Sequence, residues 1–505
     1  MENFDWRRYL LFLAIAFGVF IAYDYFFASK HLAGQNHPGV SNQTQTQNGV
    51  KTLQTTPVNV NLYLGTDRER EKPKHFITVN GTDLNVKISL EGAKVVSAYD
   101  KRFKKELIEP YERAYNIYPL EVLTSDWKTT KLANFSTYNC TKEGYKVSCS
   151  LDRDGIKVEK VFTFSKEGYI VKLDLKVEGV KDPYLYLGMT PNEEPFYTHI
   201  GPIFKLSNGE VLRPNIEDLP GITPFHGDIV WSGEEGRYFL KAAKYNTDTA
   251  VVFKVSYIHN GETKYVGATA IEVKPNSQIL FLEGPKEYDL LKEVNFVDAI
   301  DFGVLKFLAY PTFLVLYFFY KIFHSWVAAI FVLTLLLKVI FFPLMISSTR
   351  SMKKMQELAP KLQELQRKYA NDPQKLQQEM VKLYKEVGFN PFGGCLPILI
   401  QIPVFFALYK VLIVTPDLAL ERFLWIPSLA QPDPYYILPI LMGLTMVAQS
   451  WITPSPNPQQ NKMMYIMALV FTFLFATFPS GLVLYWTFNN ILSIIQTWII
   501  YKYMS

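Results

Sequence analysis

The chain has 505 residues, of which 49% are hydrophobic and 15% aromatic, and its formal net charge at pH 7 is +5. Charges are frequent between residues 58 and 293, whereas from residue 302 onward apolar stretches approach the roughly 20 residues that a spanning helix needs. This division excludes a wholly water-soluble protein. No nucleic-acid motif accompanies the small positive charge, so we expect no direct binding of nucleic acid.

The first 28 residues have the pattern of a membrane-targeting segment. Arg7 and Arg8 precede an apolar run over residues 9–28, which is typical of a signal sequence or a signal anchor. Because the run is long and residues 27–30 make a poor cleavage site, we predict a transmembrane anchor over residues 1–28 with a cytoplasmic N-terminus. Residues 29–57 are rich in Gln, Asn, Thr and Gly, which predicts a flexible linker.

Residues 58–293 have the alternation of half-buried strands and predict an all-β sandwich outside the membrane. Apolar and polar residues alternate at 84–90, 157–164, 169–177 and 250–257. Turn-forming sequences at 207–209 and 260–261 separate strands.

Two cysteines of this predicted domain flank a hairpin turn. Cys140 and Cys149 are close in sequence and would lie in an oxidising compartment. They form either a disulfide or a pair of packed thiols, and the sequence leaves both open.

Residues 294–325 precede the first long apolar run and contain Pro311. They predict either an interfacial amphipathic helix or an additional membrane span. We favour the interfacial helix because an additional span would invert the topology of everything that follows.

Five further spans are expected, which makes six transmembrane helices with the anchor, five of them forming the helical core. They lie at residues 326–346, 396–414, 435–452, 463–478 and 482–501. We therefore assign residues 326–346 to transmembrane helix 2 and residues 391–505 to helices 3–6. Residues 350–386 between them contain nine cations and five anions, which places this segment and the C-terminus in the cytoplasm.

Residues 347–390 predict a cytoplasmic helical hairpin. Leucines recur at helical spacing on both sides of a break, and Asp372 with Pro373 supplies a helix N-cap and first turn. The flexible side chains of Met352, Met355 and Met380 suit the capture of varied apolar substrates, and a plain solvated hairpin explains the periodicity equally well.

Lys338 is the strongest candidate for a functional residue. At about 1.5 Å per residue it lies roughly 12 Å inside the predicted end of its span at residue 346, where a charge costs several kcal/mol. No acidic residue lies at comparable depth in a predicted span. We therefore expect a cavity that holds water and is lined by amides and hydroxyls; snorkelling of the lysine to the interface is the alternative.

Several segments in the second half of the chain resemble the signatures of the YidC/Oxa/Alb family of membrane protein insertases. The matching segments are NPFGG at 390–394, GGCLP at 393–397, LIQIPVF at 399–405, PYYILP at 434–439 and FPSGLVLYW at 478–486. The resemblance implies a periplasmic super-sandwich and a five-helix core in the inner membrane. It also implies a hydrophilic groove in the core that is open to the cytoplasm and to lipid.

The resemblance also implies a set of groove residues. The family's usual arginine aligns with Lys338, so the charge is retained and the guanidinium fork is lost. The other implied groove residues are Gln401, Gln449, Tyr485, Trp486 and Asn489, although Trp486 also fits a packing role.

The implied function is insertion and chaperoning of nascent membrane proteins, without catalytic residues, cofactor or metal. Implied partners are the lipid bilayer and the Sec translocon. A ribosome is a weaker expectation, since no long basic extension follows Lys502. Two other hypotheses are a solute transporter or channel with a charged intramembrane site, and an exported carbohydrate-active enzyme on a membrane anchor.

Overall fold

The computed structural model describes residues 72–193, 198–259, 262–303, 305–370, 372–386, 396–453 and 458–503. The predicted anchor and linker, and the turn at 260–261, lie outside these ranges. The described chain divides into two compact units between Asp301 and Phe302. Each unit is described by itself.

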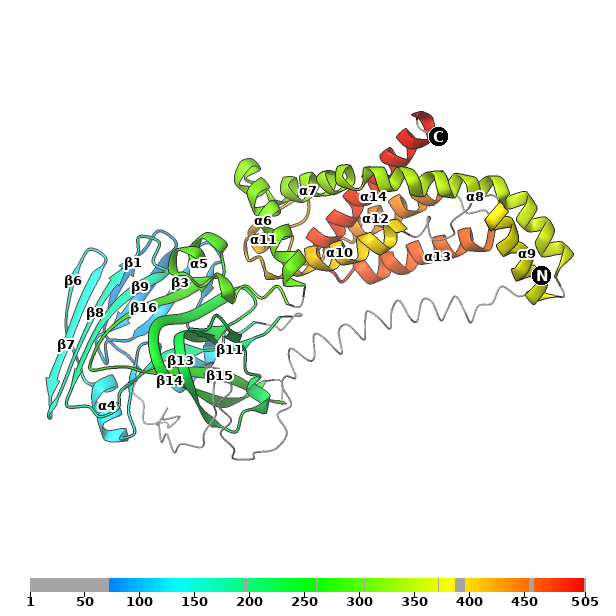
Figure 1. Cartoon of the computed structure of the whole chain (residues 1–505). Coiled ribbons are helices and arrows are strands. Elements are labelled where there is room, and N and C mark those ends of the chain that lie inside the picture. The colour runs from blue at the N-terminus through cyan, green and yellow to red at the C-terminus, as the bar shows by residue number, and fades with distance from the viewer. Residues whose placement is uncertain are drawn as a thin grey trace. The chain divides into compact units, whose positions relative to one another are not determined.

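The first unit contains sixteen strands in two antiparallel sheets (Figure 1). The smaller sheet has the order β1 (Phe76–Asn80), β2 (Leu84–Ser89), β3 (Val95–Asp100) and β4 (Lys105–Glu106). The larger sheet consists of β5 (Val122–Leu123), β6 (Asn139–Glu143), β7 (Lys146–Arg153), β8 (Ile156–Phe164), β9 (Ile170–Glu178), β10 (Tyr184–Met189), β11 (Gly201–Leu206), β12 (Val211–Leu212), β13 (Ile222–Glu235), β14 (Phe239–His259), β15 (Glu262–Glu272) and β16 (Asn276–Pro285).

Short helices complete this unit: α3 (Pro110–Tyr115), α4 (Trp127–Phe135), α5 (Tyr288–Val294), and the 3-10 turns η2 (Ile216–Asp218) and η3 (Val297–Ala299). The predicted boundary at residue 293 falls too early, because Phe296 is buried and its ring lies 5.0 Å from that of Trp231. Residues 294–301 therefore belong to the β unit.

Period-two alternation produces the strands that were predicted at 84–90, 157–164 and 169–177. In β9, Leu173, Leu175 and Val177 are buried while the residues between them are exposed. The fourth predicted strand, at 250–257, is part of the much longer β14, which changes partner from β16 to β15 along its length. A strand shared by two partners cannot be delimited from local alternation alone.

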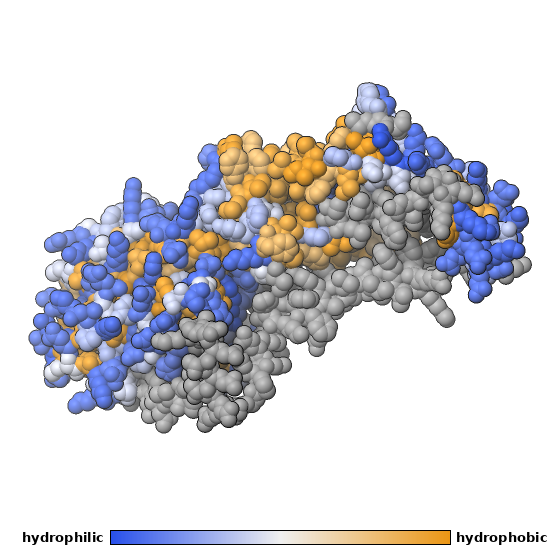
Figure 2. Space-filling model, viewed as in Figure 1, coloured by the Kyte–Doolittle hydropathy of each residue, from blue (hydrophilic) through white to orange (hydrophobic). Residues whose placement is uncertain are grey.

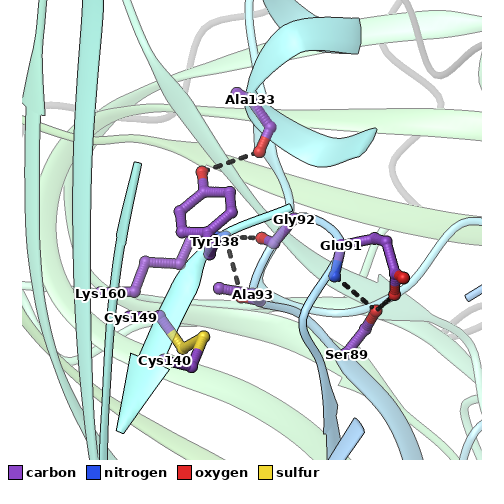
Figure 3. The surroundings of a disulfide bond; sticks show 9 residues. All are labelled: Ser89, Glu91, Gly92, Ala93, Ala133, Tyr138, Cys140, Cys149 and Lys160. Carbon is purple, nitrogen blue, oxygen red and sulfur yellow. Dashed lines mark hydrogen bonds between the residues drawn. A yellow bond between two sulfur atoms is a disulfide. The ribbon is translucent and has the colours of Figure 1, made fainter. Parts of the chain in front are cut away.

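Cys140 and Cys149 face each other on β6 and β7 and form a disulfide in the structure (Figure 3). Beside them the buried ammonium of Lys160 donates hydrogen bonds to the carbonyls of Gly92, Ala93 and Leu120, at 2.9, 3.0 and 2.7 Å. Since Lys160 lies on β8 and Gly92 lies between β2 and β3, this contact joins the two sheets.

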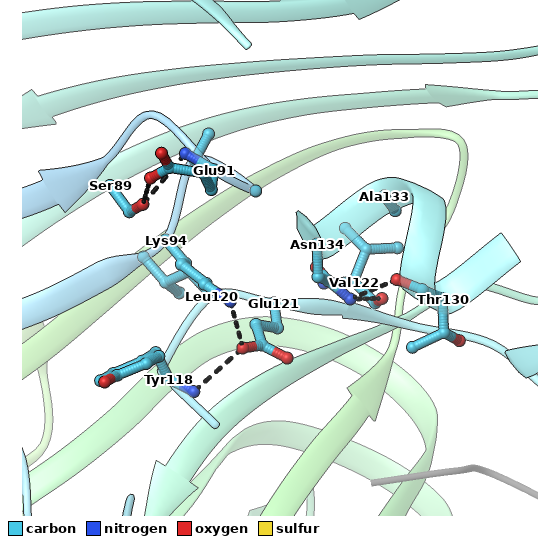
Figure 4. Close-up of polar contacts among 12 residues, drawn as sticks. Ser89, Glu91, Lys94, Tyr118, Leu120, Glu121, Val122, Thr130, Ala133 and Asn134 are labelled. Carbon is cyan, nitrogen blue, oxygen red and sulfur yellow. Dashed lines mark hydrogen bonds and ion pairs between the residues drawn. The ribbon is translucent and has the colours of Figure 1, made fainter. Parts of the chain in front are cut away.

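A second buried contact joins the segment before β3 to the segment before β5. Lys94 and Glu121 form an ion pair of 3.0 Å in which both side chains are buried (Figure 4). Nearby, the Asn134 amide on α4 hydrogen-bonds the N–H and carbonyl of Val122. Buried polar groups are satisfied here by partners distant in sequence.

The second unit is helical. Its helices are α6 (Lys306–Phe323), α7 (Trp326–Ile340), α8 (Phe342–Lys368), α9 (Pro373–Glu386), α10 (Leu396–Val414), α11 (Asp417–Leu420), α12 (Ile437–Ile452), α13 (Pro458–Phe475) and α14 (Ser480–Tyr503). Helix α14 packs against α7, α10 and α12, and α6 packs against α7 and α10. In Figure 1, α6 runs across the direction of α7.

Apolar side chains cover much of this unit's surface. Figure 2 shows a broad apolar surface over α6 and α7 and a hydrophilic surface over the hairpin of α8 and α9. Phe318 and Val339, for example, are 61% and 63% exposed. Exposed apolar surface of this extent suits contact with lipid.

By length and composition, α6 is long and apolar enough to cross a membrane, and α7 with α8 would be a second candidate if the bent pair is one span. Three shorter apolar helices are Gln401–Val414, Ile437–Ile452 and Asn461–Phe475. The interfacial location of residues 294–325 and the number of spans stay predictions.

The continuous helix expected over residues 326–346 is interrupted. Helix α7 ends at Ile340, α8 begins at Phe342, and the two are bent by 65°. Pro343 in the first turn of α8 explains the break, since proline has no N–H and its ring clashes with the preceding turn.

Candidate functional site

Lys338 lies in the last turn of α7 and is half-buried. Its ammonium donates a hydrogen bond of 2.6 Å to the Ser493 hydroxyl on α14. The Gln496 amide, one turn further along α14, donates to the Lys338 carbonyl at 3.4 Å. Two polar groups beside this lysine therefore come from α14, from residues about 155 positions away in the chain, and the cavity that holds water stays a prediction.

The bend after Ile340 changes the expected position of Lys338 within its helix. A continuous helix would have placed the lysine well inside the span, whereas it lies two residues before the C-terminal end of α7. The unpaired carbonyls at a helix C-terminus favour a cation by about 0.3–1 kcal/mol. The helix end and the Ser493 hydroxyl together offset part of the desolvation cost.

One face of α14 carries a polar stripe, which we define as Tyr485, Asn489, Ser493 and Gln496. The spacings of four, four and three residues place these side chains on one side of a helix. Tyr485 and Gln496 are buried, whereas Asn489 and Ser493 are half-buried. The stripe therefore runs from the first turns of α14 to the residues beside Lys338.

Two of the predicted groove residues meet at one end of this stripe. The Gln401 amide on α10 donates a hydrogen bond to the Tyr485 hydroxyl. Trp486, in contrast, lies in an aromatic cluster with Phe405, Phe471 and Phe475, with ring centroids 5.2 to 6.2 Å apart. Trp486 therefore packs among aromatic side chains, and its place in a groove stays a prediction.

Gln449 on α12 approaches α14 at the other end of the stripe. Its amide nitrogen lies 3.5 Å from the Thr497 hydroxyl, and its amide oxygen is buried without a partner among the described residues. Asn490 donates to the Thr445 hydroxyl at 3.0 Å and ties α14 to α12. Both contacts lie on the flank of α14 next to the polar stripe.

Ser493 and Gln496 hydrogen-bond Lys338, and neither was among the groove residues predicted from the sequence. A single serine in an apolar helix has no distinctive signal. The spacing of Ser493 from Asn489 and Tyr485 was a usable signal, because one polar face of a helix repeats every three or four residues.

The hairpin of α8 and α9 is held by a small apolar contact. Leu358 and Leu362 are buried against Met380 and Leu383. At the turn, the Asp372 carboxylate accepts the N–H of Lys375, as an N-cap should.

The three candidate capture methionines differ in their surroundings. Met380 stabilises the hairpin through its contact with α8, while Met352 is half-buried. The side chain of Met355 lies outside the described ones.

Residues 417–436, which we call the cap segment, contact the starts of α7, α12 and α14, at the opposite end of the helical unit from the hairpin (Figure 1). The Glu421 carboxylate accepts hydrogen bonds from the Ser325 hydroxyl and the Trp326 N–H, at 2.9 and 3.1 Å. Buried Asp433 accepts from the Trp425 indole and from the backbone of α12. Carboxylates at helix N-termini are stabilised by the unpaired N–H groups there.

Among the described residues, no group of three or more His, Cys, Asp or Glu side chains is arranged to hold a metal ion. The site contains hydroxyls, amides and one ammonium. Such groups can bind and orient a polypeptide through hydrogen bonds and charge attraction.

Two family descriptions match most of the chain. Residues 76–315 match the YidC periplasmic domain, and residues 318–505 match the 60Kd inner membrane protein. The membrane protein insertase YidC of Aquifex aeolicus (strain VF5) is 44% identical over 501 residues, which cover 99% of this chain and 96% of that relative. The corresponding protein of Wolinella succinogenes is 33% identical over 532 residues, covering 99% of this chain and 96% of that relative.

Among solved structures, the crystal structure of an active YidC insertase with its first transmembrane domain resolved is 19% identical. It covers 88% of this chain and 95% of that chain, with a TM-score of 0.43. On the two family matches and the full-length relatives, this chain belongs to the YidC family of membrane protein insertases.

Proposed function

We propose that this inner-membrane protein, which has a periplasmic domain, inserts nascent membrane proteins through a groove along the polar stripe of α14. The observation that carries the proposal is the contact of the Lys338 ammonium with Ser493 on the polar stripe. The family assignment supports insertion and not a solute transporter, channel or carbohydrate-active enzyme.

The mechanism follows from the cost of moving polar groups through hydrocarbon. A charged residue at the centre of a bilayer costs about 2.5–3.5 kcal/mol on insertion scales. Hydroxyls and amides of the polar stripe replace part of the water that a polar tail would lose. The tail then has a shorter nonpolar distance to cross.

Lys338 supplies the charge in this mechanism. Its ammonium attracts carboxylates of an incoming tail, while the substrate's apolar segment moves sideways into lipid. Each methylene group of that segment that becomes buried in lipid contributes about 0.8 kcal/mol of favourable free energy, and this drives the movement. The membrane potential adds about 2.3 kcal/mol per charge for each 100 mV.

The closed and open ends of the groove follow from the same arrangement. The cap segment binds the start of α7 and α12 and so supports a groove that is closed on the outer side. Lys338 lies at the opposite end of α7, beside the helix that leads to the hairpin. We propose that the hairpin and both termini face the cytoplasm, and that nascent chains enter there.

Two partners are part of this proposal. The Sec translocon would supply substrates with several spans, and the exposed cations of the hairpin offer a surface for a ribosome. Copurification with a stalled nascent chain would test both partners. Insertion by the reconstituted chain alone would show that neither partner is obligatory.

The experiment that tests the function measures insertion of a single-span substrate with an acidic tail into proteoliposomes. Lys338→Ala is expected to lower tail translocation by about tenfold or more, since each 1.4 kcal/mol of lost attraction is tenfold. Lys338→Arg keeps the charge and is expected to retain translocation.

Lys321→Ala is the matched control, since it removes an exposed lysine at the end of α6. Normal translocation by Lys338→Ala would refute the proposed role of the ammonium.

A further inference from the structure

Three helices of the second unit begin at the cap segment, and the cap binds each of them. The N-terminal groups of α7 meet Glu421, those of α12 meet Asp433, and those of α14 meet the carbonyls of Leu429 and Gln431. A polar tail that is to reach the outer side by way of the groove meets this closed end. A tail that leaves the groove at this end, instead of crossing the remaining hydrocarbon beside it, requires some part of the cap to separate from a helix.

The contacts of the cap with α14 are made by its backbone. The N–H of Gly481 donates to the Leu429 carbonyl at 2.9 Å, and the N–H of Ser480 donates to the Gln431 carbonyl at 2.8 Å. The Ser480 hydroxyl donates to the same carbonyl at 2.7 Å. A Cβ atom at Gly481 would lie 3.3 Å from the Leu429 oxygen, so a side chain at this position fits after a shift of a few tenths of an ångström.

The cap contacts the start of α7 through the side chain of Glu421. Glu421 accepts from the Ser325 hydroxyl and from the Trp326 N–H. A side chain can leave its partners by rotation, whereas the backbone contacts with α14 require the cap itself to move. The seam between the cap and α7 is therefore the one that opens more readily.

Trp326 at this seam has an unsatisfied polar group. The side chain is 1% exposed, and its buried indole N–H has no hydrogen-bond partner among the described residues. A buried donor without a partner is unfavourable, and an opened seam would let it meet water or a carbonyl of a passing chain. Trp326 also begins the helix that carries Lys338, twelve residues or about 18 Å further along.

We propose that the cap segment is a gate: it separates from α7 at Glu421, and stays bound to α14, while a substrate's polar tail crosses to the outer side. This inference rests on the proposed insertase function. Opening on the α7 side places the exit at the far end of the helix that holds Lys338.

The test uses the full chain in proteoliposomes, in a Cys395→Ala background that keeps the Cys140–Cys149 disulfide. Ser325→Cys with Glu421→Cys is joined by a short, reducible bis-methanethiosulfonate linker. The linked protein is expected to translocate an acidic tail at least about tenfold more slowly, because the linked seam cannot open. Reduction of the linker should restore the rate.

The matched control is Leu429→Cys with Gly481→Cys. A Cβ at residue 481 lies 3.6 Å from the Leu429 Cβ, which suits a disulfide. Oxidation of this pair is expected to leave translocation within about twofold of the reduced protein, since the cap stays on α14 during gating. Normal translocation by the joined Ser325/Glu421 pair, or a block by the oxidised control, overturns the gate as stated.

Two further readouts keep the outcomes separate. If the protein with only Cys395→Ala does not translocate the tail, in an assay where a related insertase does, the proposed function itself is wrong. If the Ser325/Glu421 variant is inactive even when reduced, photocrosslinking replaces the activity assay. A photoreactive phenylalanine is placed at position 326 in one variant and at position 338 in another, and crosslinks to the substrate's tail are measured. A crosslink between position 326 and the tail supports opening of the seam. Crosslinks from position 338 without any from position 326 overturn it.

Discussion

Replacement of Glu283 by glutamine in the periplasmic domain should remove a large part of that domain's pH dependence. Glu283 on β16 lies in a buried cluster of carboxylates around the Lys241 ammonium. Lys241 lies 2.6 Å from Glu112 and 3.7 Å from Glu283. The cluster also contains the carboxylates of Glu109, the N-cap residue of α3, and Glu234 on β13.

The carboxylates of this cluster outnumber the ammonium groups of Lys241 and Lys105, so full ionisation would leave a net negative charge and protons are retained. Burial raises the pKa of Glu283 from its ordinary value of 4.5 to about 8, against the favourable charge of Lys241. Burial likewise raises the pKa of Glu234 to about 8 and that of Glu109 to about 7. These acids are held neutral in the folded domain near pH 6.

The sign of the effect follows from linkage. An acid whose pKa is raised on folding contributes stability that is fully present below pH 4.5 and is lost as the pH rises to about 8. For Glu283 alone the difference corresponds to at most about 5 kcal/mol of unfolding free energy, at about 1.4 kcal/mol per pH unit. Glutamine stays neutral, so Glu283→Gln should be more stable than the parent at pH 9 by up to that amount and similar to it at pH 4.

Hydrogen exchange of the full chain in detergent, followed over β14 and β16 between pH 5 and pH 9, measures the opening of this region once intrinsic exchange rates are divided out. Glu143→Gln, at an exposed position on β6, is the control and should follow the parent. If Glu283→Gln loses protection between pH 5 and pH 9 as steeply as the parent, the assignment of a buried proton to this cluster is wrong.

Three other changes test separate contacts. Asp433→Ala leaves one indole N–H and two backbone N–H groups without their acceptor. It should lower the free energy of unfolding of the helical unit by about 2–4 kcal/mol, and with it the thermal midpoint. A midpoint equal to that of Asp433→Asn would contradict this. Gly443→Ala places a Cβ against the Thr472 side chain and should destabilise the packing of α12 on α13 by about 1–3 kcal/mol. Adding Thr472→Ala should restore most of the loss, and additive effects of the two changes would argue against the contact. Replacing Cys140 and Cys149 by serine removes a cross-link with a sequence separation of 9 residues and should lower the free energy of unfolding by about 2–3 kcal/mol, measured with denaturant. An unchanged free energy would mean that the two thiols are free in the native protein.

Local patterns in the sequence determined much of the architecture. Alternation at period two marked strands such as β8 and β9, and leucines at helical spacing with Asp372 marked the two helices of the hairpin. These features are decided by residues within one or two turns of each other, which is why a linear reading finds them. The family signatures are likewise short continuous segments, and the comparisons confirmed the family they indicated.

The tertiary structure alone decided the partners of the key side chains. Lys338 meets Ser493, Trp486 joins the aromatic cluster instead of the polar stripe, and Lys241 gathers carboxylates from separate elements. The bend at Phe341 also moved Lys338 from the predicted middle of a long helix to a helix end. Periodicity tells which face of a helix or strand is polar, but which two faces meet depends on how whole elements pack, and that choice is made by the summed burial of many residues far apart in the chain.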